Sequence, residues 1–363
     1  MSNLKKKKLA ILTAGGDCPG LNSVIASFTL AAINNGYEVT GIKGSFEGLL
    51  DTKHYINLDV QKISGIKHTG GTILGTANKG LFCSKAGNGE TLQIPKEVLL
   101  KAKNNLDKEK IQALAVLGGD GSLNTAYQLS KVGVKIIGCP KTIDNDILGI
   151  DTTFGFSTAV DYINQAIERI HTTAESHGRI FIVETMGRSA GWLGLYGGIS
   201  GGANAILIPE IPFDVKDIVK FLNKRHKKHG IIIVSEGAKA KDQVETILEV
   251  GTSKENRLGG IAKKLKREID IITNGKIDIR TLVLGHLQRG GNPNWYDKIL
   301  CTQYGVSAFN AIKDKNYNVV VNIKNKKIDY IPLEKIADGV KLVPANHPLI
   351  NVAKDLGIFI GSF

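Results

Sequence analysis

The chain is organised around one stretch, Cys139-Pro-Lys-Thr-Ile-Asp-Asn-Asp146, which follows the apolar run Val134–Gly138. A short apolar run of this kind is typical of a buried strand. Because proline has no N–H to donate to a strand ladder, we expect the chain to leave the sheet at Pro140. In an open α/β sheet, ligands bind where loops leave the carboxyl ends of strands. The loop after Pro140 is therefore the first candidate site.

Two carboxylates of this loop, Asp144 and Asp146, lie two positions apart. Such a pair can divide its roles, one carboxylate binding a metal and the other accepting a proton. The alternative is a polar turn with only local Asx hydrogen bonds. Similar clusters after other strands favour the functional interpretation.

Apolar runs alternate with stretches of helical periodicity along the chain. Strands are expected at 9–14, 39–42, 113–117, 134–138, 179–185, 205–208, 230–235 and 281–284. This alternation is typical of parallel sheets covered by helices on both faces. Glycine-rich or charged clusters follow these strands at Gly15–Asp17, Gly118–Ser122, Lys141–Asp146, Gly187–Arg188, Glu236 and His286–Arg289. Parallel strands would bring these clusters to shared edges, where they can face one cleft.

The composition is that of an ordinary globular protein long enough for two domains. The chain has 363 residues, of which 42% are hydrophobic and 22% charged. Its 42 glycines suggest tight loops and close backbone approach to ligands. No stretch approaches the roughly 18 apolar residues of a membrane span, and we expect no secretory signal. We therefore expect no membrane partner.

The spacing of the cysteines and the net charge also restrict the cellular compartment and the kinds of partner. The four cysteines form no Cys-x-x-Cys pair, which favours buried thiols in a reducing, cytoplasmic compartment. The net charge is +13, with lysine-rich runs at 5–8, 225–228 and 263–267. We interpret these runs as solvated helix faces and a frayed terminus, because no aromatic residues or nucleic-acid-binding motifs accompany them. A basic excess also suits an enzyme that collects phosphorylated substrates.

Two glycine-rich clusters have the composition of phosphate-binding loops. In Gly118–Ser122 the glycines would let backbone N–H groups approach phosphate oxygens at a helix N-terminus. Ser122 is expected to be the N-cap, and Asp120 to bind Mg²⁺. Gly15–Gly20 is a second cradle, and neither cluster is a GxGxxG or Walker A motif. Gly-Gly-Asp-Gly also occurs in NAD kinases and lipid kinases, so alone it indicates only phosphoryl transfer.

Five motifs together resemble the signature set of 6-phosphofructokinases. In family order they are Gly15-Gly-Asp-x-Pro-Gly-x-Asn22, Gly118–Ser122, Pro140–Asp146, Met186-Gly-Arg-x-Ala-Gly191 and Gly285-His-x-Gln-Arg-Gly-Gly291. The resemblance covers nearly the whole chain. It implies an α/β fold of two three-layer α/β/α domains, with mostly parallel sheets and an active-site cleft between them. The nucleotide-binding domain would comprise 1–155 with about 288–338, and the sugar-phosphate domain 156–287 with about 339–363.

The resemblance implies Mg²⁺-assisted phosphoryl transfer from ATP to the 1-hydroxyl of fructose 6-phosphate. Asp144 resembles the base, with Thr142 and Arg188 also catalytic, and Asp120 and Asp146 match carboxylates that organise Mg²⁺. The implied nucleotide group is Gly15, Gly16, Asn78, Lys79, Gly119, Asp120, Gly121, Ser122 and Lys141. The implied sugar-phosphate group is Thr142, Ile143, Asp144, Arg179, Met186, Gly187, Arg188, Glu236, Arg280, His286, Leu287, Gln288 and Arg289. Arg179 and Arg280 match arginines that serve a neighbouring subunit, so a homodimer or homotetramer is expected.

Four positions bear on the phosphoryl donor. Asn78 stands where bacterial ATP enzymes usually carry arginine, and Lys79 supplies charge without a guanidinium fork. Lys141 matches the lysine of pyrophosphate enzymes, whereas Gly121 replaces their aspartate and leaves room for a nucleotide α-phosphate. This combination resembles the ATP-using members of the mixed-substrate subgroup. We expect ATP as donor; the alternatives are a pyrophosphate-dependent enzyme and a non-catalytic protein that binds sugar phosphate or nucleic acid.

Overall fold

The computed structural model describes residues 6–77, 79–84, 91–241, 247–249, 257–336 and 339–361. The chain divides into two compact units, each assembled from three segments. Unit 1 comprises Met1–Ile143, Ile147–Thr158 and Arg289–Val340, and unit 2 comprises Asp144–Asp146, Ala159–Gln288 and Lys341–Phe363.

Unit 1 contains a mostly parallel sheet with the strand order β14-β13-β5-β4-β1-β2-β3, and β6 pairs with the end of β5. Strands β1, β2, β4, β5 and β13 are parallel, whereas β3 and β14 run antiparallel at the two edges. The bounds are β1 Lys8–Thr13, β2 Glu38–Ile42, β3 Tyr55–Leu58, β4 Ile111–Gly118, β5 Ile136–Thr142, β6 Phe154–Gly155, β13 Val319–Lys324 and β14 Lys327–Pro332.

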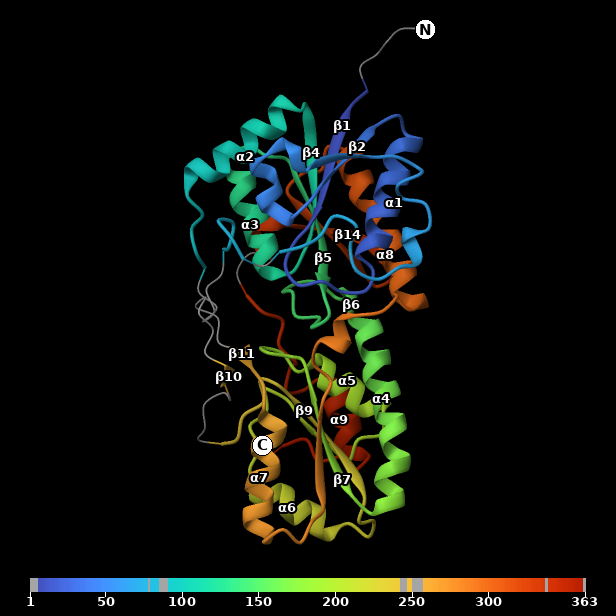
Figure 1. Ribbon diagram of the computed structural model, residues 1–363, viewed down its shortest axis with the longest axis vertical. Coiled ribbons are helices and arrows are strands. Elements are labelled where there is room, and N and C mark those ends of the chain that lie inside the picture. The colour runs from blue at the N-terminus through green and yellow to red at the C-terminus, as the bar shows by residue number, and fades with distance from the viewer. Residues whose placement is uncertain are drawn as a thin grey trace. The chain divides into compact units, whose positions relative to one another are not determined.

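Helices cover both faces of this sheet (Figure 1). Helices α1 (Leu21–Asn34) and α8 (Trp295–Lys313) pack on one face, and α2 (Lys96–Lys108) and α3 (Asp120–Lys131) on the other. Because both faces are buried, the inner strands are almost continuously apolar. Short 3₁₀ turns lie in the connections at Ser45–Leu50, Thr52–His54, Ile66–His68 and Leu333–Lys335.

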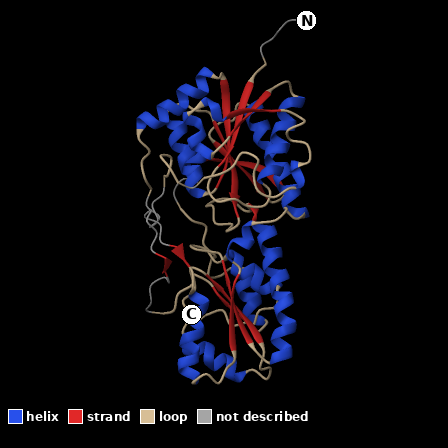
Figure 2. Ribbon diagram, viewed as in Figure 1, coloured by secondary structure: helices blue, strands red, loops and turns tan. Residues whose placement is uncertain are grey.

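Unit 2 contains a four-stranded parallel sheet with the order β12-β7-β9-β8. Helices again lie on both sides of its strands (Figure 2). Helices α6 and α7 share one apolar core with the sheet, whereas α5 contacts β8, β9 and α9. The bounds are α4 Phe156–His177, β7 Ile180–Thr185, α5 Trp192–Ser200, β8 Ala205–Leu207, α6 Val215–Lys224, β9 Gly230–Ser235, α7 Ile261–Thr273, β12 Ile279–Val283, the 3₁₀ turn η4 Gly285–Arg289 and α9 Pro348–Asp355.

A separate two-stranded antiparallel sheet pairs β10 (Ile247–Glu249) with β11 (Arg257–Leu258). Among the described residues, every helix is too short or too polar to cross a bilayer. The predicted α/β class with mostly parallel sheets is confirmed.

Strand β5 continues through Pro140, so the expectation that the chain leaves the sheet there is wrong. Pro140 lies opposite Gly118 at the end of β4, and the next two residues pair with β6 instead. Proline lacks a backbone N–H donor but keeps its carbonyl acceptor, so it can remain in a strand. Strand β6 replaces β4 as the partner of β5 after Pro140. Lys141 and Thr142 are therefore held in the sheet, and the loop begins after them.

Candidate active site

Loops after β1 and β4 meet the end of β5 in a small cradle within unit 1. Lys141 is 4% exposed, and its Nζ donates to the carbonyl oxygen of Gly16 at 2.5 Å. Gly15 has a left-handed φ of 79°, and a Cβ there would lie 3.2 Å from both Lys141 Nζ and Ser122 Oγ. Glycine thus lets the backbone approach an ammonium group and a hydroxyl closely. Ammonium and hydroxyl groups are both able to donate hydrogen bonds to phosphate oxygens.

A second cation borders the same cradle. A Cβ on Gly16 would lie 2.5 Å from a terminal guanidinium nitrogen of Arg289, the last residue of η4. The resemblance assigned Arg289 to the sugar phosphate. In unit 1 the structure brings it to the glycines assigned to the phosphoryl donor.

Thr76 and Ala77 are anchored to the cradle by two hydrogen bonds. Gly15 N–H donates to Ala77 O at 3.0 Å, and Thr76 Oγ1 donates to Gly15 O at 2.6 Å. Lys79 follows this anchor and is exposed, whereas Asn78 lies outside the described residues. Thr76 was not among the predicted site residues, although it fixes the position of Gly15.

Helix α3 begins one turn earlier than the N-cap prediction requires. Its first residue is Asp120 and its N-cap is Gly119, so the expectation that Ser122 is the N-cap is wrong. Asp120 Oδ1 accepts the N–H of Gly121 at 2.6 Å, and Ser122 instead places its hydroxyl near Gly15. Gly119 has an extended backbone and no side chain, so the N-cap residue itself accepts no first-turn N–H through a side chain. The unpaired first-turn N–H groups of a helix favour an anion at this end.

Three thiols near these loops are buried and unreactive in character. The side chains of Cys18, Cys139 and Cys301 are almost fully buried, whereas Cys83 is exposed to solvent. In the described part of the chain all four are free thiols rather than disulfides. Burial raises the pKa of Cys139 to about 12 and raises that of Cys18 further, despite the nearby Lys141 ammonium. The buried thiols stay protonated at neutral pH and act as small apolar side chains.

Unit 2 gathers a second set of predicted residues at the carboxyl edge of its sheet. Met186–Arg188 follow β7, Glu236 follows β9, and η4 follows β12. The buried Gln288 joins two of these loops, because its Oε1 accepts the Met186 N–H at 3.3 Å and its Nε2 donates to Gly285 O at 3.0 Å. The Glu236 N–H donates to Thr185 O at 2.9 Å.

Close backbone contact brings the β7 and β9 loops together. Gly187 has a left-handed φ of 121°, and a Cβ on Gly237 would lie only 1.9 Å from Arg188 O. Arg188 and Glu236 are half-buried on these loops, whereas His286 and Leu287 on η4 are exposed. A cation, a carboxylate and an imidazole can therefore be presented from one sheet edge.

The Asp144–Asp146 segment has a constrained backbone. Asn145, between the two carboxylates, is buried and has a left-handed φ of 51°, a conformation that asparagine tolerates better than most residues. Asp146 O accepts the Lys341 N–H at 2.8 Å. Asp144 and Asp146 are themselves half-buried. Within the described ranges there is no group of three or more His, Cys, Asp or Glu side chains able to hold a metal ion.

Arg179 and Arg280 lie at the opposite, amino edge of the unit 2 sheet. Arg179 Nε and Arg280 Nη1 bind the two oxygens of Asp278, at 2.6 and 2.5 Å. The hydrogen bond from Arg179 holds the pKa of Asp278 below its usual value, and the charge of Arg280 adds to this. Strand β7 spans about 20 Å. The structure therefore does not bring these arginines to Met186–Arg188 of the same chain.

A family model described as phosphofructokinase matches residues 8–312. The chain belongs to this family. It is 45% identical over 359 residues to ATP-dependent 6-phosphofructokinase 2 of Clostridium perfringens, covering 97% of this chain and 98% of the relative. It is 41% identical over 360 residues to ATP-dependent 6-phosphofructokinase of Chloroflexus aggregans, with 98% of each chain covered.

Solved phosphofructokinases share the fold. The Pichia pastoris phosphofructokinase in the T-state is 30% identical with a TM-score of 0.79; the match covers 99% of this chain but 37% of the yeast chain. The chain thus spans just over a third of that protein. The pyrophosphate-dependent phosphofructokinase from Marinobacter aquaeolei also has a TM-score of 0.79, over 98% of this chain and 89% of the other. At 21% identity that likeness concerns the fold alone. The predicted family is confirmed.

One buried carboxylate that supports the end of β5 was missed by sequence reasoning. Asp297 is fully buried and accepts the N–H groups of Gly155 at 3.1 Å and Thr158 at 2.8 Å, together with the Thr158 hydroxyl. Gly155 pairs in turn with Thr142. The Asn294-x-x-Asp297 spacing before an apolar helix resembles a capping box and could have revealed it.

Proposed function

We propose that this phosphofructokinase transfers the γ-phosphoryl group of ATP to the 1-hydroxyl of fructose 6-phosphate. Relatives at 36–45% identity over nearly their full length carry the name ATP-dependent 6-phosphofructokinase. The observation that carries the proposal is the unit 1 cradle, in which Lys141 and Ser122 adjoin Gly15 and Arg289 adjoins Gly16.

The cradle suits phosphoryl transfer because that reaction depends on positioning and on cations around the transferring group. The buried Lys141 ammonium is fixed by Gly16 O, so it can act as a positioned point charge. Arg289 offers a guanidinium, which can bind phosphate oxygens in pairs. The first turn of α3 adds backbone N–H donors.

Gly121 supports ATP as the donor. It lies in the first turn of α3, and its carbonyl accepts the Ser84 hydroxyl at 2.7 Å, so its backbone is held in place. A carboxylate at this position would add negative charge beside a nucleotide α-phosphate. Lys141 is compatible with either donor, because a flexible ammonium can bind a β-phosphate or a pyrophosphate terminus.

On the acceptor side, we assign Asp144 as the base that takes the proton of the sugar hydroxyl. The left-handed Asn145 constrains the turn that carries it. Arg188, Glu236 and His286 would bind the sugar phosphate from the edge of the unit 2 sheet. Thr142, held in β5 by its pairing with Gly155, would lie beside the transferred group.

Mg²⁺ is implied by the family, and the available donors fit it. Asp120 and Asp146 are carboxylates, and Mg²⁺ is usually bound by one or two carboxylates together with substrate phosphates rather than by a protein cage. When bound, the ion would neutralise charge on the phosphate oxygens. We propose that Asp120 and Asp146 hold it, directly or through water.

Arg179 and Arg280 would complete the sugar-phosphate site of a neighbouring subunit. Their place at the amino edge of the unit 2 sheet supports this, because Met186–Arg188 lie at the carboxyl edge. A homodimer or homotetramer is then required for activity. The burial of three free thiols suits the proposed cytoplasmic location.

A donor assay tests the proposal directly. Purified protein with fructose 6-phosphate and Mg²⁺ should form fructose 1,6-bisphosphate with ATP and little with pyrophosphate. Efficient use of pyrophosphate alone would favour the pyrophosphate-dependent alternative. Binding of sugar phosphate without turnover by either donor would favour the non-catalytic alternative.

A further inference from the structure

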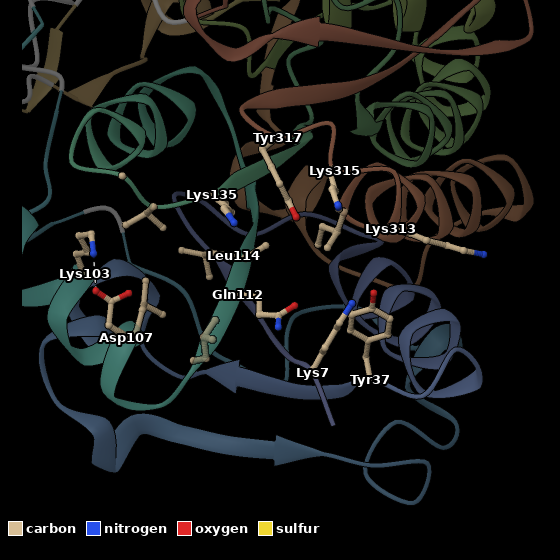
Figure 3. Close-up of a pocket in the computed structure, with 16 residues that line it drawn as sticks. Lys7, Tyr37, Lys103, Asp107, Gln112, Leu114, Lys135, Lys313, Lys315 and Tyr317 are labelled. Atoms are coloured by element: carbon tan, nitrogen blue, oxygen red, sulfur yellow. Dashed lines mark hydrogen bonds and ion pairs between the residues drawn. The ribbon is translucent and has the colours of Figure 1, made fainter. Parts of the chain in front are cut away.

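A hollow of ≈ 530 Å³ lies at the amino edge of the unit 1 sheet. We call it the lysine basin and define it by Lys7, Tyr37, Lys103, Lys135, Lys315 and Tyr317 (Figure 3). Its volume is within the range of about 300–1,000 Å³ that is usual for small-molecule sites. Strand β4, about 26 Å long, begins at the basin and ends at the cradle, so the two sites are distinct.

The charge of the basin is strongly one-sided. Five lysines and one aspartate line it. The aspartate, Asp107, pairs with Lys103, and Lys313 extends away from the other lysines and donates to Asn35 Oδ1 at 3.4 Å (Figure 3). Within the described part of the chain, no carboxylate forms an ion pair with the remaining three lysines, Lys7, Lys135 and Lys315. Three ammonium groups therefore border one hollow without an acidic partner.

The side chains are held by rings and by the sheet. Lys7 Nζ lies 5.8 Å from the centroid of the Tyr37 ring, and Lys135 Nζ lies 5.0 Å from that of Tyr317. Asn318 and Ile136 exchange two hydrogen bonds, of 2.7 and 3.1 Å, which tie the start of β13 to the start of β5. Figure 3 shows Tyr317 between Lys135 and Lys315. Two of the three lysines, Lys7 and Lys135, are therefore held against aromatic rings.

Helix-end stabilisation explains only part of this charge. Helices α2, α3 and α8 end near the basin, and lysines near helix carboxyl ends interact favourably with the dipole. Lys7 and Lys135, however, precede strands β1 and β5. Their convergence on one hollow needs another explanation.

We propose that the lysine basin binds a small phosphate-bearing polyanion, separately from the cradle. Lysine ammonium groups bind phosphate as point charges, and Tyr317 can add a hydroxyl donor. One lysine ammonium already lies over each of the two rings, so we take the phosphate chain rather than an aromatic base as the recognised part. An inorganic polyphosphate and the phosphates of a nucleotide share this chemistry.

Lys315 allows a test that separates binding from folding. It has a left-handed φ of 59° at the position after the α8 C-cap, where glycine is most favourable. Lys315→Gly should therefore remove a basin cation without loss of thermal stability. Lys110 has φ 57° at the same position after α2 and does not line the basin. Lys110→Gly is thus a control matched in charge and backbone.

Inorganic tripolyphosphate is titrated calorimetrically into the full-length native protein and the two variants at one ionic strength. We expect a binding event, separate from any at the cradle, whose affinity falls about fivefold or more in Lys315→Gly and changes less than twofold in Lys110→Gly. A parallel titration with ATP distinguishes the sources, since a second, Lys315-sensitive event would indicate that nucleotides also bind there. If no event responds to Lys315→Gly, or both variants weaken binding equally, the attraction is at most diffuse charge and the proposal is wrong.

Discussion

At the scale of single residues, the proposed chemistry depends on a few positioned groups. Lys141 is buried and fixed by Gly16 O, and Gly15 allows the ammonium to come close to the backbone. Asp144 lies beside an asparagine in a left-handed conformation. Each of these arrangements restricts one group to one place, which phosphoryl transfer requires.

Replacement of Asp144 by asparagine should preserve shape and remove the proton acceptor. Loss of a general base typically lowers turnover by about 10² to 10⁴. We expect that decrease in a steady-state assay, with little change in the affinity for fructose 6-phosphate. Asp151→Asn, at an exposed position further along the same connection, is the control and should keep native turnover. Near-native turnover of Asp144→Asn would show that the base is another group.

Gly121 should decide the donor. Gly121→Asp would bring a carboxylate to the α-phosphate, a repulsion of about 1 to 4 kcal/mol depending on the effective dielectric constant. We therefore expect kcat/KM for ATP to fall tenfold or more. Gly121→Ala adds bulk without charge, so its kcat/KM for ATP should fall less than that of Gly121→Asp. An unimpaired ATP reaction in Gly121→Asp would contradict the donor assignment but not the sugar kinase assignment.

At the scale of elements, buried hydrogen bonds hold the strand that carries Thr142. Asp297 lies in the first turn of α8. Its carboxylate accepts hydrogen bonds from the N–H of Gly155 in β6 and the N–H of Thr158 at the start of α4. Gly155 pairs with Thr142 through β6. One carboxylate thus connects two helix starts with the end of β5.

Asp297→Asn should destabilise the protein and reduce turnover. The amide would turn an N–H₂ group toward donors that now share a carboxylate, and hydrogen bonds to charged groups contribute about 1.5–3 kcal/mol each. We expect a loss of about 2–3 kcal/mol in the free energy of unfolding, measured by urea denaturation. Asp314→Asn, at the exposed C-cap of the same helix, should change stability by no more than about 0.5 kcal/mol. Equal free energies of unfolding for Asp297→Asn and Asp314→Asn would show that the hydrogen bonds of Asp297 do not stabilise the protein.

Elements and motifs were largely predictable from the sequence, whereas contacts between distant segments were not. Apolar runs located the strands within a few residues, because burial on both faces leaves a clear local pattern. The end of β5 was misplaced, because β6, which supplies its last partner, is too short to leave a pattern. Of the lysine basin, only Lys7 lies in a run that we interpreted from the sequence, as part of a frayed terminus. Lys135 and Lys315 were not singled out, since the three lysines come together only through the order of the strands.

At the scale of the whole molecule, each proposed active site needs residues from two chains. Arg179 and Arg280 share Asp278 at the amino edge of the unit 2 sheet, and Met186–Arg188 lie at the carboxyl edge. Paired arginines held by one aspartate form a compact cationic group that another subunit can use.

Subunit mixing tests this sharing. Arg280→Ala and Asp144→Asn should each be nearly inactive alone. After subunit exchange, a mixed dimer would contain one site with both native residues, so about a quarter of native activity should return. Each variant taken alone through the same exchange procedure provides the baseline without complementation. Absence of rescue in verified mixed oligomers would count against a shared site.

The interleaved segments of the two units also bear on biosynthesis. Strand β13 pairs with the edge of β5. Asn318, which accepts a hydrogen bond from Ile136 of β5, lies 182 residues after Ile136 in the sequence. In unit 2, Ala205 bridges to Phe359 near the end of the chain. At ribosomal rates of about 5–20 residues per second, β13 is synthesised roughly ten to forty seconds after β5. During that interval an apolar strand edge is available for wrong pairing, so nascent chains should depend on chaperones until translation is nearly complete.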